Sequence, residues 1–554
     1  MAFLVKLPIY TIHALLLHLT LLLRGCVIFW KYFMPNNYNV LPASQPSALL
    51  LIPQDDVLVA CQDISMGDQV PNGVEFLMAK GTIPRGHKIS RHIIEVGQPV
   101  RKFGQIIGFA SIKIAAGDHV HSHNLEAGLF DREHLFGTDA TPLKSSEEKR
   151  YFDGFDRGDG RYGTRNYVAI ISTVNCSASV SKYIVRDLEK KGILKDFPEV
   201  DGVVAITHKA GCAMQYGGPD HHQLNRTLAG IANHPNVAAY LIVGLGCETG
   251  QASHLIENEH LIQLGMPGKQ VPEVLNIQDL GGISNTVEAG TSAVLRLLMR
   301  ARGSKRSRLC ADKLILATNC GGSDGYSGVT ANPALGVASD LLVRQGGTTV
   351  LAETTEIYGA EHLLTRRAIS REVGEKLLAR IRWWEWYTQI FGAQINNNPS
   401  PGNKAGGLTT IYEKSLGAIA KAGTSPMVDV LLYAEPIKSK GFIVMDTPGY
   451  DPVSMTGLAA GGANIGVFTT GRGSVFGCKP MPCIKVATNT PMFKRMEADM
   501  DLDAGTILDG ESVFSTGERI FEEILAVASG KKTKSEISGV GDEEFAPWSI
   551  GPTL

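Results

Sequence analysis

The sequence predicts a multidomain α/β protein with a small β-rich unit on its N-terminal side. Two patterns carry this prediction. Between residues 47 and 125, short extended runs are broken by Gly and Pro, and no long helical period appears. From about residue 165, short apolar runs end in small or polar residues and helical stretches follow, which is typical of parallel α/β layers. Because 44% of its 554 residues are hydrophobic, the chain can bury several cores.

The composition excludes some partners. The net charge is −2, so there is no strong basic field to hold nucleic acid, and we expect no nucleic-acid partner. The 61 glycines exceed the average share of about 7% and indicate many tight turns. Nine cysteines in so long a chain do not form a disulfide scaffold, so we expect reduced thiols in a cytoplasmic protein.

Residues 1–40 differ from the rest of the chain and form an apolar leader of doubtful status. His13, His18 and Arg24 interrupt its apolar run, and Met34 begins an ordinary polar stretch. One interpretation is a leader that is not part of the working protein. The other is a targeting or membrane segment, which would tether the protein. Apart from that second interpretation, we expect no membrane partner.

The remaining chain divides into four segments. Residues 47–125 form the β-rich unit, and the polar residues 126–150 read as a linker. Residues 151–300 and 305–554 form two α/β units. In parallel α/β sheets, ligands bind beyond the carboxyl ends of the strands, so we expect the chemistry where the apolar runs end.

Four cysteines share that position. Cys176, Cys212, Cys247 and Cys320 each lie at or just past the end of an apolar run, and three of them have glycine neighbours. Thiolates in such loops can bind iron, zinc or an iron–sulfur cluster. The long spacings match no compact Cys-x-x-Cys signature. The alternative is that they are buried thiols that pack as small apolar residues.

Several histidines are candidates for acid–base chemistry or metal binding. His119, His121 and His123 alternate in HVHSHN, and on a strand this spacing places all three on one face. His208, four residues before Cys212, is a further candidate base. The alternatives are an edge strand with solvated histidines and a loop histidine bonded to the backbone.

Polar loops supply candidate substrate-binding residues. Arginine can hold a carboxylate by paired hydrogen bonds, lysine can stabilise an enolate, and backbone amides of a glycine-rich turn can cradle an anion. The candidates of these kinds are Arg161, Arg165, Asn166, Ser323, Asp324, Asn403, Lys404 and Arg472. The alternative for each is a solvated turn. There is no Walker loop, no G-x-G-x-x-G after a strand and no G-x-S-x-G elbow, so no nucleotide cofactor or α/β-hydrolase is supported.

Taken together, these segments resemble the family of altronate and galactarate dehydratases, from about residue 47 to the C-terminus. The stretches that carry the resemblance are GHKI (86–89), KFGQIIG (102–108), GDHVHSHN (117–124), DGRYGTRN (159–166), GLGCE (244–248), CGGSDGYSGVTANPALG (320–336), NPSPGNKAGG (398–407), FTTGRGSVFG (468–477) and DAGTILDG (503–510). GDHVHSHN and THKAGC (207–212) are more similar to the altronate branch.

The resemblance implies an N-terminal β-clip domain of the antifreeze-like type, a middle domain that mediates homodimer contacts and a Rossmann-like C-terminal domain. It also implies loss of water from a sugar acid, with D-altronate giving 2-keto-3-deoxy-D-gluconate. The implied cofactor is a divalent metal, Fe²⁺ in the first place, with Mn²⁺ or an iron–sulfur cluster left open. The four cysteines would hold it.

In this interpretation His121, His123 or His208 is the base, and Arg161, Arg165 or Lys404 holds the substrate carboxylate. Three other functions remain open. One is dehydration of galactarate, another is release of sulfite from sulfolactate, and the last is metal or sugar-acid binding without catalysis.

Overall fold

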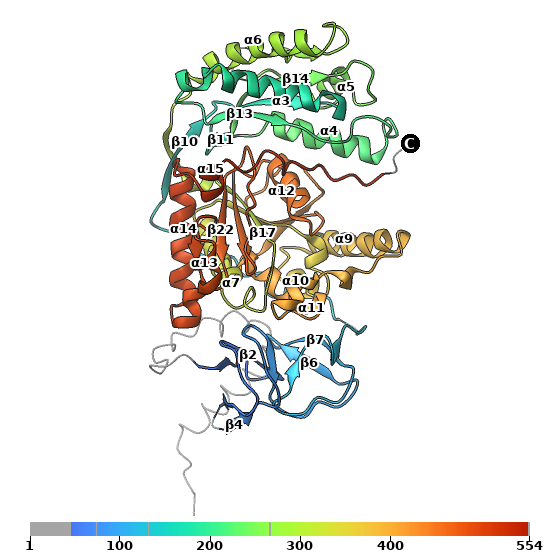
Figure 1. The fold of residues 1–554 in the computed structure, drawn as a ribbon, viewed down its shortest axis with the longest axis vertical. Helices are drawn as coiled ribbons and strands as arrows, with labels where there is room; N and C mark the ends of the chain where they lie inside the picture. Colours follow the sequence, from blue (N-terminus) through green and yellow to red (C-terminus); the bar gives the residue numbers. More distant parts are fainter. Residues whose placement is uncertain (1–45, 74, 131, 265–267, 552–554) are drawn as a thin grey trace, which may run out of the picture.

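The computed structural model describes residues 46–551 apart from 74, 131 and 265–267. Three parts follow one another along the long axis (Figure 1). The N-terminal unit, in blue, lies at one end, the middle unit, in green, at the other, and the C-terminal unit between them. The leader at residues 1–40 lies outside the described residues. Among the described helices, none has both the length and the apolar character needed to span a bilayer.

The N-terminal unit consists of short antiparallel strands. One sheet has the order β1 (Ala48–Leu49), β2 (Val57–Ala60), β5 (Lys88–Ser90) and β8 (His119–Val120). A second has the order β6 (Pro99–Lys102), β7 (Gln105–Ala110) and β9 (Leu125–Glu126), and β3 (Gln69–Asn72) pairs with β4 (Glu75–Met78). Gly117 enters β8 with φ +85°, and a Cβ there would lie 2.1 Å from the Met78 carbonyl oxygen. Only glycine fits this turn.

The middle unit has a parallel sheet with the order β13 (Gly202–Ile206), β12 (Tyr167–Ser172), β14 (Val237–Gly244) and β15 (Val274–Asn276). All residues of β12 and β14 are buried, as expected for strands covered on both faces. Helices α3 (Asn175–Lys190) and α6 (Ile283–Ala301) contribute to the core on one face, and α4 (Pro219–Ala232) and α5 (Ala252–Asn258) to the core on the other. The turn η1 (Ile193–Asp196) follows α3.

The C-terminal unit has seven parallel strands. Their order is β19 (Met427–Leu431), β20 (Gly441–Met445), β18 (Thr348–Leu351), β17 (Ile315–Cys320), β21 (Ile465–Thr470), β22 (Cys483–Ala487) and β23 (Leu502–Asp503). The helices are α7 (Ala331–Arg344), α8 (Glu361–Thr365), α9 (Arg371–Ile390), α10 (Pro401–Ala405), α11 (Ile411–Ala418), α12 (Asp451–Ala460), α13 (Thr490–Arg495), α14 (Val513–Ala528) and α15 (Lys534–Ser538). Short 3-10 turns are η2 (Ala311–Lys313), η3 (Thr354–Glu356), η4 (Ile395–Asn397), η5 (Ile419–Ala422) and η6 (Gly505–Asp509).

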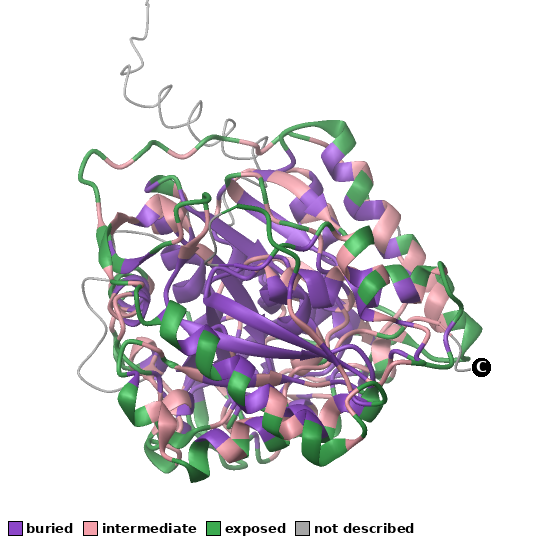
Figure 2. Cartoon of the chain, turned by 90° about the horizontal axis from the view of Figure 1, so that it is seen from above, coloured by how far each residue is buried: buried purple, intermediate pink, exposed green. Residues whose placement is uncertain are grey.

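The middle and C-terminal units share a core. Helix α12 packs against α4, and at Gly230 a Cβ would lie 2.1 Å from the Ala460 carbonyl oxygen, so glycine permits this close approach. A small sheet of β11 (Tyr162–Gly163), β10 (Tyr151–Asp156) and β16 (Ser307–Cys310) joins the segments on either side of the middle unit. Figure 2 shows the buried strands in purple, surrounded by helices with partly exposed faces.

The N-terminal unit covers loops at the carboxyl ends of the C-terminal sheet. Val57, Ile107 and Val120 share a hydrophobic core with residues of the C-terminal unit. The Tyr326 hydroxyl, which follows β17, donates to the Ala60 carbonyl oxygen at 2.6 Å. The chain thus forms a domain interface at the sheet edge where α/β proteins bind ligands.

Candidate active site

Four imidazole rings gather at this interface. The centroid of the His119 ring lies 5.1 Å from that of His87, and 5.4 Å from those of both His121 and His123. The His87 and His121 rings are stacked at 4.9 Å. The structure therefore brings together the three histidines that the sequence singled out and adds His87.

The predicted strand over all three histidines of HVHSHN is wrong. Strand β8 ends at Val120, and a turn follows. The turn forms because the Asn124 side chain accepts a hydrogen bond from the His121 amide at 2.9 Å and donates one to the His119 carbonyl oxygen at 2.9 Å. The imidazoles meet through this turn and not through a period of two.

The ring nitrogens contact a loop of the C-terminal unit. His121 Nε2 lies 2.9 Å from the carbonyl oxygen of Lys404, and His87 Nε2 lies 3.3 Å from that of Ala405. Because a carbonyl only accepts, we assign the proton to Nε2 in both rings. His87 Nδ1 then accepts from His119 Nε2 at 3.0 Å, and His121 Nδ1 accepts from the Ser122 hydroxyl at 3.0 Å.

Burial keeps these rings neutral. It lowers the pKa of His87 to about 4 and that of His119 to about 3, and it also lowers the pKa of His121. A neutral imidazole has a lone pair and can act as a base.

The Lys404 loop is fixed by Asn403. Ser400 caps α10 by accepting from the Asn403 amide at 3.3 Å, and the Asn403 side chain accepts from the Ser400 amide at 3.0 Å. Asn403 Nδ2 also donates to the Ser323 carbonyl oxygen at 2.9 Å. Asn403 therefore joins the loop after β17 to α10, the helix that contains Lys404.

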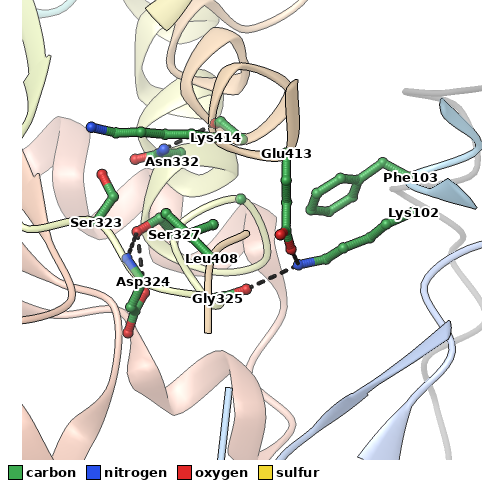
Figure 3. A pocket seen from close by; sticks show the side chains of 12 residues that line it. Lys102, Phe103, Ser323, Asp324, Gly325, Ser327, Asn332, Leu408, Glu413 and Lys414 are labelled. Carbon is green, nitrogen blue, oxygen red and sulfur yellow. Dashed lines mark hydrogen bonds and ion pairs between the residues drawn. The ribbon is translucent and has the colours of Figure 1, made fainter. Parts of the chain in front are cut away.

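The loop after β17 contains an unsatisfied hydroxyl. Ser323 is 2% exposed, and its Oγ has no hydrogen-bond partner among the described residues. It lines a cavity of about 10 Å³, room for about one water molecule (Figure 3). An unpaired buried hydroxyl is available to a ligand.

Asp324 is fully engaged within the protein. Its carboxylate accepts from Thr488 Oγ1 at 2.9 Å, Ser327 Oγ at 3.1 Å, Asn489 Nδ2 at 3.2 Å and the Tyr326 amide at 3.1 Å. These donors tie the ends of β17 and β22 together. Asp324 thus positions the Ser323 loop.

Arg472 belongs to the same group of loops. Its amide donates to the Gly322 carbonyl oxygen at 2.8 Å. A Cβ at Gly406 would lie 3.2 Å from Arg472 Cδ and 3.0 Å from Asp324 Cβ. The loops after β17 and β21 and the end of α10 therefore meet, and glycine lets them approach.

One buried carboxylate fastens the N-terminal unit over these loops. Glu413 accepts from Lys88 Nζ and from Lys102 Nζ, both at 2.9 Å, and all three side chains are at most 1% exposed. Lys102 also donates to the Gly325 carbonyl oxygen at 3.3 Å (Figure 3). Burial alone would raise the pKa of Glu413, but the two ammonium groups hold it well below the usual range. The carboxylate is therefore ionised.

Cys320 lies in a buried polar network under the site. With Glu353 and Glu356 it forms the only group of three metal-ligating atoms within 4.8 Å of one another among the described residues. Lys421 Nζ lies 2.8 Å from Cys320 Sγ and 2.7 Å from Glu353 Oε2, and Lys414 Nζ lies 2.6 Å from Glu356 Oε1.

This group does not fit a divalent metal as it is arranged. Burial raises the pKa of the Cys320 thiol, and a metal ligand has to be the thiolate. The ammonium of Lys421 lies between two of the three ligands. A metal ion could bind this group only by displacing the Lys421 ammonium.

Four of the sequence candidates lie in or beside the middle unit. Arg161 forms an ion pair with Asp159 at 2.7 Å. Arg165 is 1% exposed and pairs with Glu536 at 2.6 Å, and it also donates to three backbone carbonyls. The structure therefore does not bring these two arginines to the histidines.

Asn166 and His208 are also bonded within the fold. Asn166 is buried and donates to the carbonyl oxygens of Glu199 and Ala301. His208 Nε2 lies 2.9 Å from the Ser172 carbonyl oxygen, and its Nδ1 accepts from the Ala210 amide at 3.2 Å. His208 lies after β13 in the middle unit and is bonded within the fold there, so the structure does not bring it to the histidines of the interface.

The four cysteines do not share one site. Cys320 is buried in the C-terminal unit, whereas Cys176, Cys212 and Cys247 are exposed at the carboxyl edge of the middle sheet. The prediction of one site formed by all four cysteines is therefore wrong, because Cys320 lies in a different unit from the other three.

Comparison with known proteins identifies the family. Three of its sequence models match: the altronate/galactarate dehydratase SAF domain at residues 46–128, the second domain of D-galactarate dehydratase/altronate hydrolase at 154–302, and the C-terminal domain of D-galactarate/altronate dehydratase at 311–553. The chain belongs to the altronate and galactarate dehydratase family. The predicted membership and the SAF domain at the N-terminus of a mixed α/β chain are confirmed.

Individual members of the family are similar over nearly their whole length. The altronate dehydratase of Bacillus subtilis (strain 168) is 37% identical over 506 residues, 90% of this chain and 98% of its own. That of Escherichia coli (strain K12) is 35% identical over 501 residues, with the same coverage. The galactarate dehydratase (L-threo-forming) of Escherichia coli (strain K12) is 37% identical over 487 residues, 86% of this chain and 92% of its own.

Some residues of this interface were not singled out from the sequence. His87 and Lys88 lie in GHKI and Lys102 lies in KFGQIIG, so both motifs contained a signal in their charged or imidazole residues. Glu413 gave no signal, because an acidic residue in a helical stretch is ordinarily solvated. Only the folded interface shows that it neutralises two lysines.

Proposed function

We propose that the chain is a hydro-lyase that removes water from D-altronate to give 2-keto-3-deoxy-D-gluconate. The relatives named altronate dehydratase support the reaction class, since they match over 98% of their own length. The observation that carries the site is the convergence of His121 and His123 with the loops of Ser323, Lys404 and Arg472 at a domain interface.

The cations and the hydroxyl of this site suit a hydroxy acid. Lys404 or Arg472 would bind the carboxylate, because an ammonium or guanidinium forms charge-assisted hydrogen bonds with it. The unpaired Ser323 hydroxyl would bond a substrate hydroxyl. The Asn403 and Asp324 side chains hold the loops in place and are positioning residues.

The histidines would move the protons. His121 or His123 would take the proton from C2 on a ring lone pair. For His121 this is Nδ1, which would exchange the hydrogen bond from the exposed Ser122 hydroxyl for the substrate proton. The electron pair left at C2 forms the C2–C3 double bond as the 3-hydroxyl, protonated by an acid, leaves as water. The enol then tautomerises to the 2-keto acid.

A divalent metal is the proposed cofactor, Fe²⁺ first and Mn²⁺ as the alternative. When bound, it would supply Lewis-acid stabilisation to the enediolate, because a carboxylate's α-proton is only weakly acidic. The sequence offered Cys176, Cys212 and Cys247 for it, but these exposed thiols lie in the middle unit, at the opposite end of the molecule from the N-terminal unit that contains His121 and His123 (Figure 1). A metal bound there would not contact an enediolate at the histidines of the same chain, so the imidazoles of the interface are the alternative ligands.

The test is a 2-keto acid assay with altronate, galactarate and sulfolactate, with iron added under reducing conditions. Turnover of altronate above the other two supports the proposal. Galactarate turnover or sulfite release would assign the alternative activities. Tight binding of a sugar acid without product would assign a binding protein. Full activity of a His121→Ala/His123→Ala variant after exhaustive chelation would contradict the mechanism.

We further propose a cytoplasmic homodimer with dimer contacts in the middle unit, and the β-clip and Rossmann-like descriptions for the terminal domains. Light scattering of the purified chain measures the first, with a mass twice 59.6 kDa expected. Fractionation of cells that express the chain from Met1 and from Met34 measures the location. Recovery of either chain with membranes would instead assign a tether.

A further inference from the structure

A lysine amine and a cysteine sulfur lie against each other in the core of the C-terminal unit. Lys421 Nζ, in η5, is 2.8 Å from Cys320 Sγ, at the end of β17. The other hydrogen-bond contacts of cysteine sulfur in the described part of the chain are longer, from 3.3 Å at Cys247 to 3.9 Å at Cys61. The contact between Cys320 and Lys421 is therefore unusually close.

Neighbouring groups hold this pair in place. Cys320 is 2% exposed and Lys421 is fully buried. Lys421 Nζ also donates to Glu353 Oε2 at 2.7 Å, and the same oxygen accepts from the Cys320 amide at 3.0 Å. One carboxylate thus bonds both residues and keeps the nitrogen against the sulfur.

Two carboxylates beside the pair can take its protons. Cys320 Sγ lies 3.6 Å from Glu356 Oε2, which can accept the thiol proton. Glu353 can accept a proton from the Lys421 ammonium, because its Oε1 is buried without a hydrogen-bond partner among the described residues and burial raises its pKa. Loss of these protons leaves a thiolate and a neutral amine, which are the nucleophilic forms of the two groups.

The separation of the two atoms suits one bridging oxygen. Two single bonds that meet at an oxygen atom span slightly less than the observed 2.8 Å, so an oxygen joins Sγ to Nζ with little movement. A direct bond between sulfur and nitrogen would need a much closer approach of two side chains that are packed and hydrogen-bonded.

We propose that Cys320 and Lys421 form a covalent bridge through one oxygen atom when the protein is exposed to hydrogen peroxide. One peroxide converts the thiol to a sulfenic acid: an S–O bond forms, the O–O bond breaks and water leaves. A second peroxide converts the amine to a hydroxylamine and water in the same way. The hydroxylamine oxygen then attacks the sulfenic sulfur, and the sulfenic hydroxyl leaves as water.

The reaction consumes two peroxide molecules and releases three waters. Sulfur and nitrogen each lose two electrons, and the peroxide oxygens gain these four. The extra proton of the Lys421 ammonium passes to Glu353, which lies 2.7 Å away. The bridge joins η5 to the end of β17, three residues before Ser323. Its formation does not depend on the proposed reaction.

The experiment is mass spectrometry of the full chain after treatment with hydrogen peroxide, with exposed thiols first blocked by iodoacetamide. We expect a linked pair of peptides, one with Cys320 and one with Lys421. The pair should be about 14 Da heavier than the two peptides together, from one oxygen gained and two hydrogens lost. Two molecules of dithiothreitol supply four electrons, so this reductant should separate the peptides and restore the thiol and the amine.

The unmodified chain contains its own control. Cys61 is also buried, but its Sγ contacts the Val59 carbonyl oxygen, at 3.9 Å, so it should give no linked peptide. The Cys320→Ser variant should lose the link, and its urea midpoint shows whether it is folded.

Three results would overturn the proposal. They are a Cys320 that remains a free thiol, a sulfinic acid at Cys320 with Lys421 unlinked, and a link that lacks the added oxygen. Because these readouts use no substrate, a chain that forms the bridge but does not dehydrate altronate would contradict only the proposed function.

Discussion

The carboxyl edges of the two parallel sheets differ in whether another part of the chain covers them. In the C-terminal unit, the N-terminal unit covers the loops, and buried side chains such as Asp324 and Asn403 are hydrogen-bonded there. In the middle unit, the corresponding edge presents exposed thiols at the ends of three strands. The first edge is covered by another unit of the chain, and the second is open to solvent at its cysteines.

The difference shows what a covering domain does. Burial at the interface between the N-terminal and C-terminal units lowers the pKa of His87 and His119, and the same interface pairs Glu413 with two lysines. A partly buried site of this kind suits proton transfer by neutral bases. The uncovered edge presents its thiols to solvent. Experiments that alter one edge at a time test whether the two edges have separate roles.

The largest effect is expected on kcat, from substitutions at the edge that the N-terminal unit covers. His121→Ala/His123→Ala should lower kcat by about 10²- to 10⁴-fold, because the proposed base is lost. The measurement is 2-keto acid formation from altronate, with iron content determined on the same sample. His92→Ala, a histidine that is 53% exposed and pairs with Asp56, is the control and should remain active. A drop in iron content in the double variant would show that the two edges are not independent.

The next largest effect is expected on stability, from removal of the Glu413 carboxylate that holds the N-terminal unit in place. Glu413→Gln leaves two buried ammonium groups without a counter-charge, so we expect a loss of about 3–5 kcal/mol in the free energy of unfolding. Urea denaturation measures it. Glu95→Gln, which breaks the exposed pair with Lys113, should cost at most about 1 kcal/mol. Equal effects of the two changes would mean that Glu413 does not hold the N-terminal unit in place.

The sequence predicted the α/β units because their buried strands are continuous apolar runs, such as VAAYLIVG in β14. It also placed Ser323 and Lys404 in polar loops, but it put His121 and His123 on a strand, where the structure has a turn. It could not predict which ends meet. Arg165 has the same residue type and loop position as Arg472, but the fold pairs it with Glu536, 371 residues away in the chain. Such long-range partners depend on domain docking, which local patterns do not encode.

Substitutions at the neighbouring residues Ser323 and Asp324 should have smaller effects, and the two effects should differ. Ser323→Ala removes a hydroxyl that bonds no described residue, so stability should change by less than about 0.5 kcal/mol. If substrate uses this hydroxyl, kcat/KM falls about tenfold. Asp324→Asn alters a carboxylate that accepts four donors and should destabilise the protein by about 1–3 kcal/mol. A Ser323→Ala variant with unchanged kinetics would remove this residue from the site.

The smallest effect is on the pH dependence of stability. The pKa of His87 is about 4 in the folded chain, because the ring is buried, and the ordinary value is 6.5. Between these values the unfolded chain binds more protons than the folded one. The stability contributed by the neutral ring is therefore complete above pH 6.5 and is lost as the pH falls towards about 4. His208, whose pKa burial lowers to about 4, acts in the same direction in the middle unit.

The variant His87→Gln separates these contributions. Glutamine can still bond the Ala405 carbonyl oxygen but does not titrate, so the shift of the urea midpoint between pH 7.5 and 5 should become smaller than in the unchanged chain. His92→Gln at the surface should leave the shift as it is. A variant that keeps the full shift would place the acid sensitivity outside the covered edge, with His208 of the middle unit as the next residue to replace.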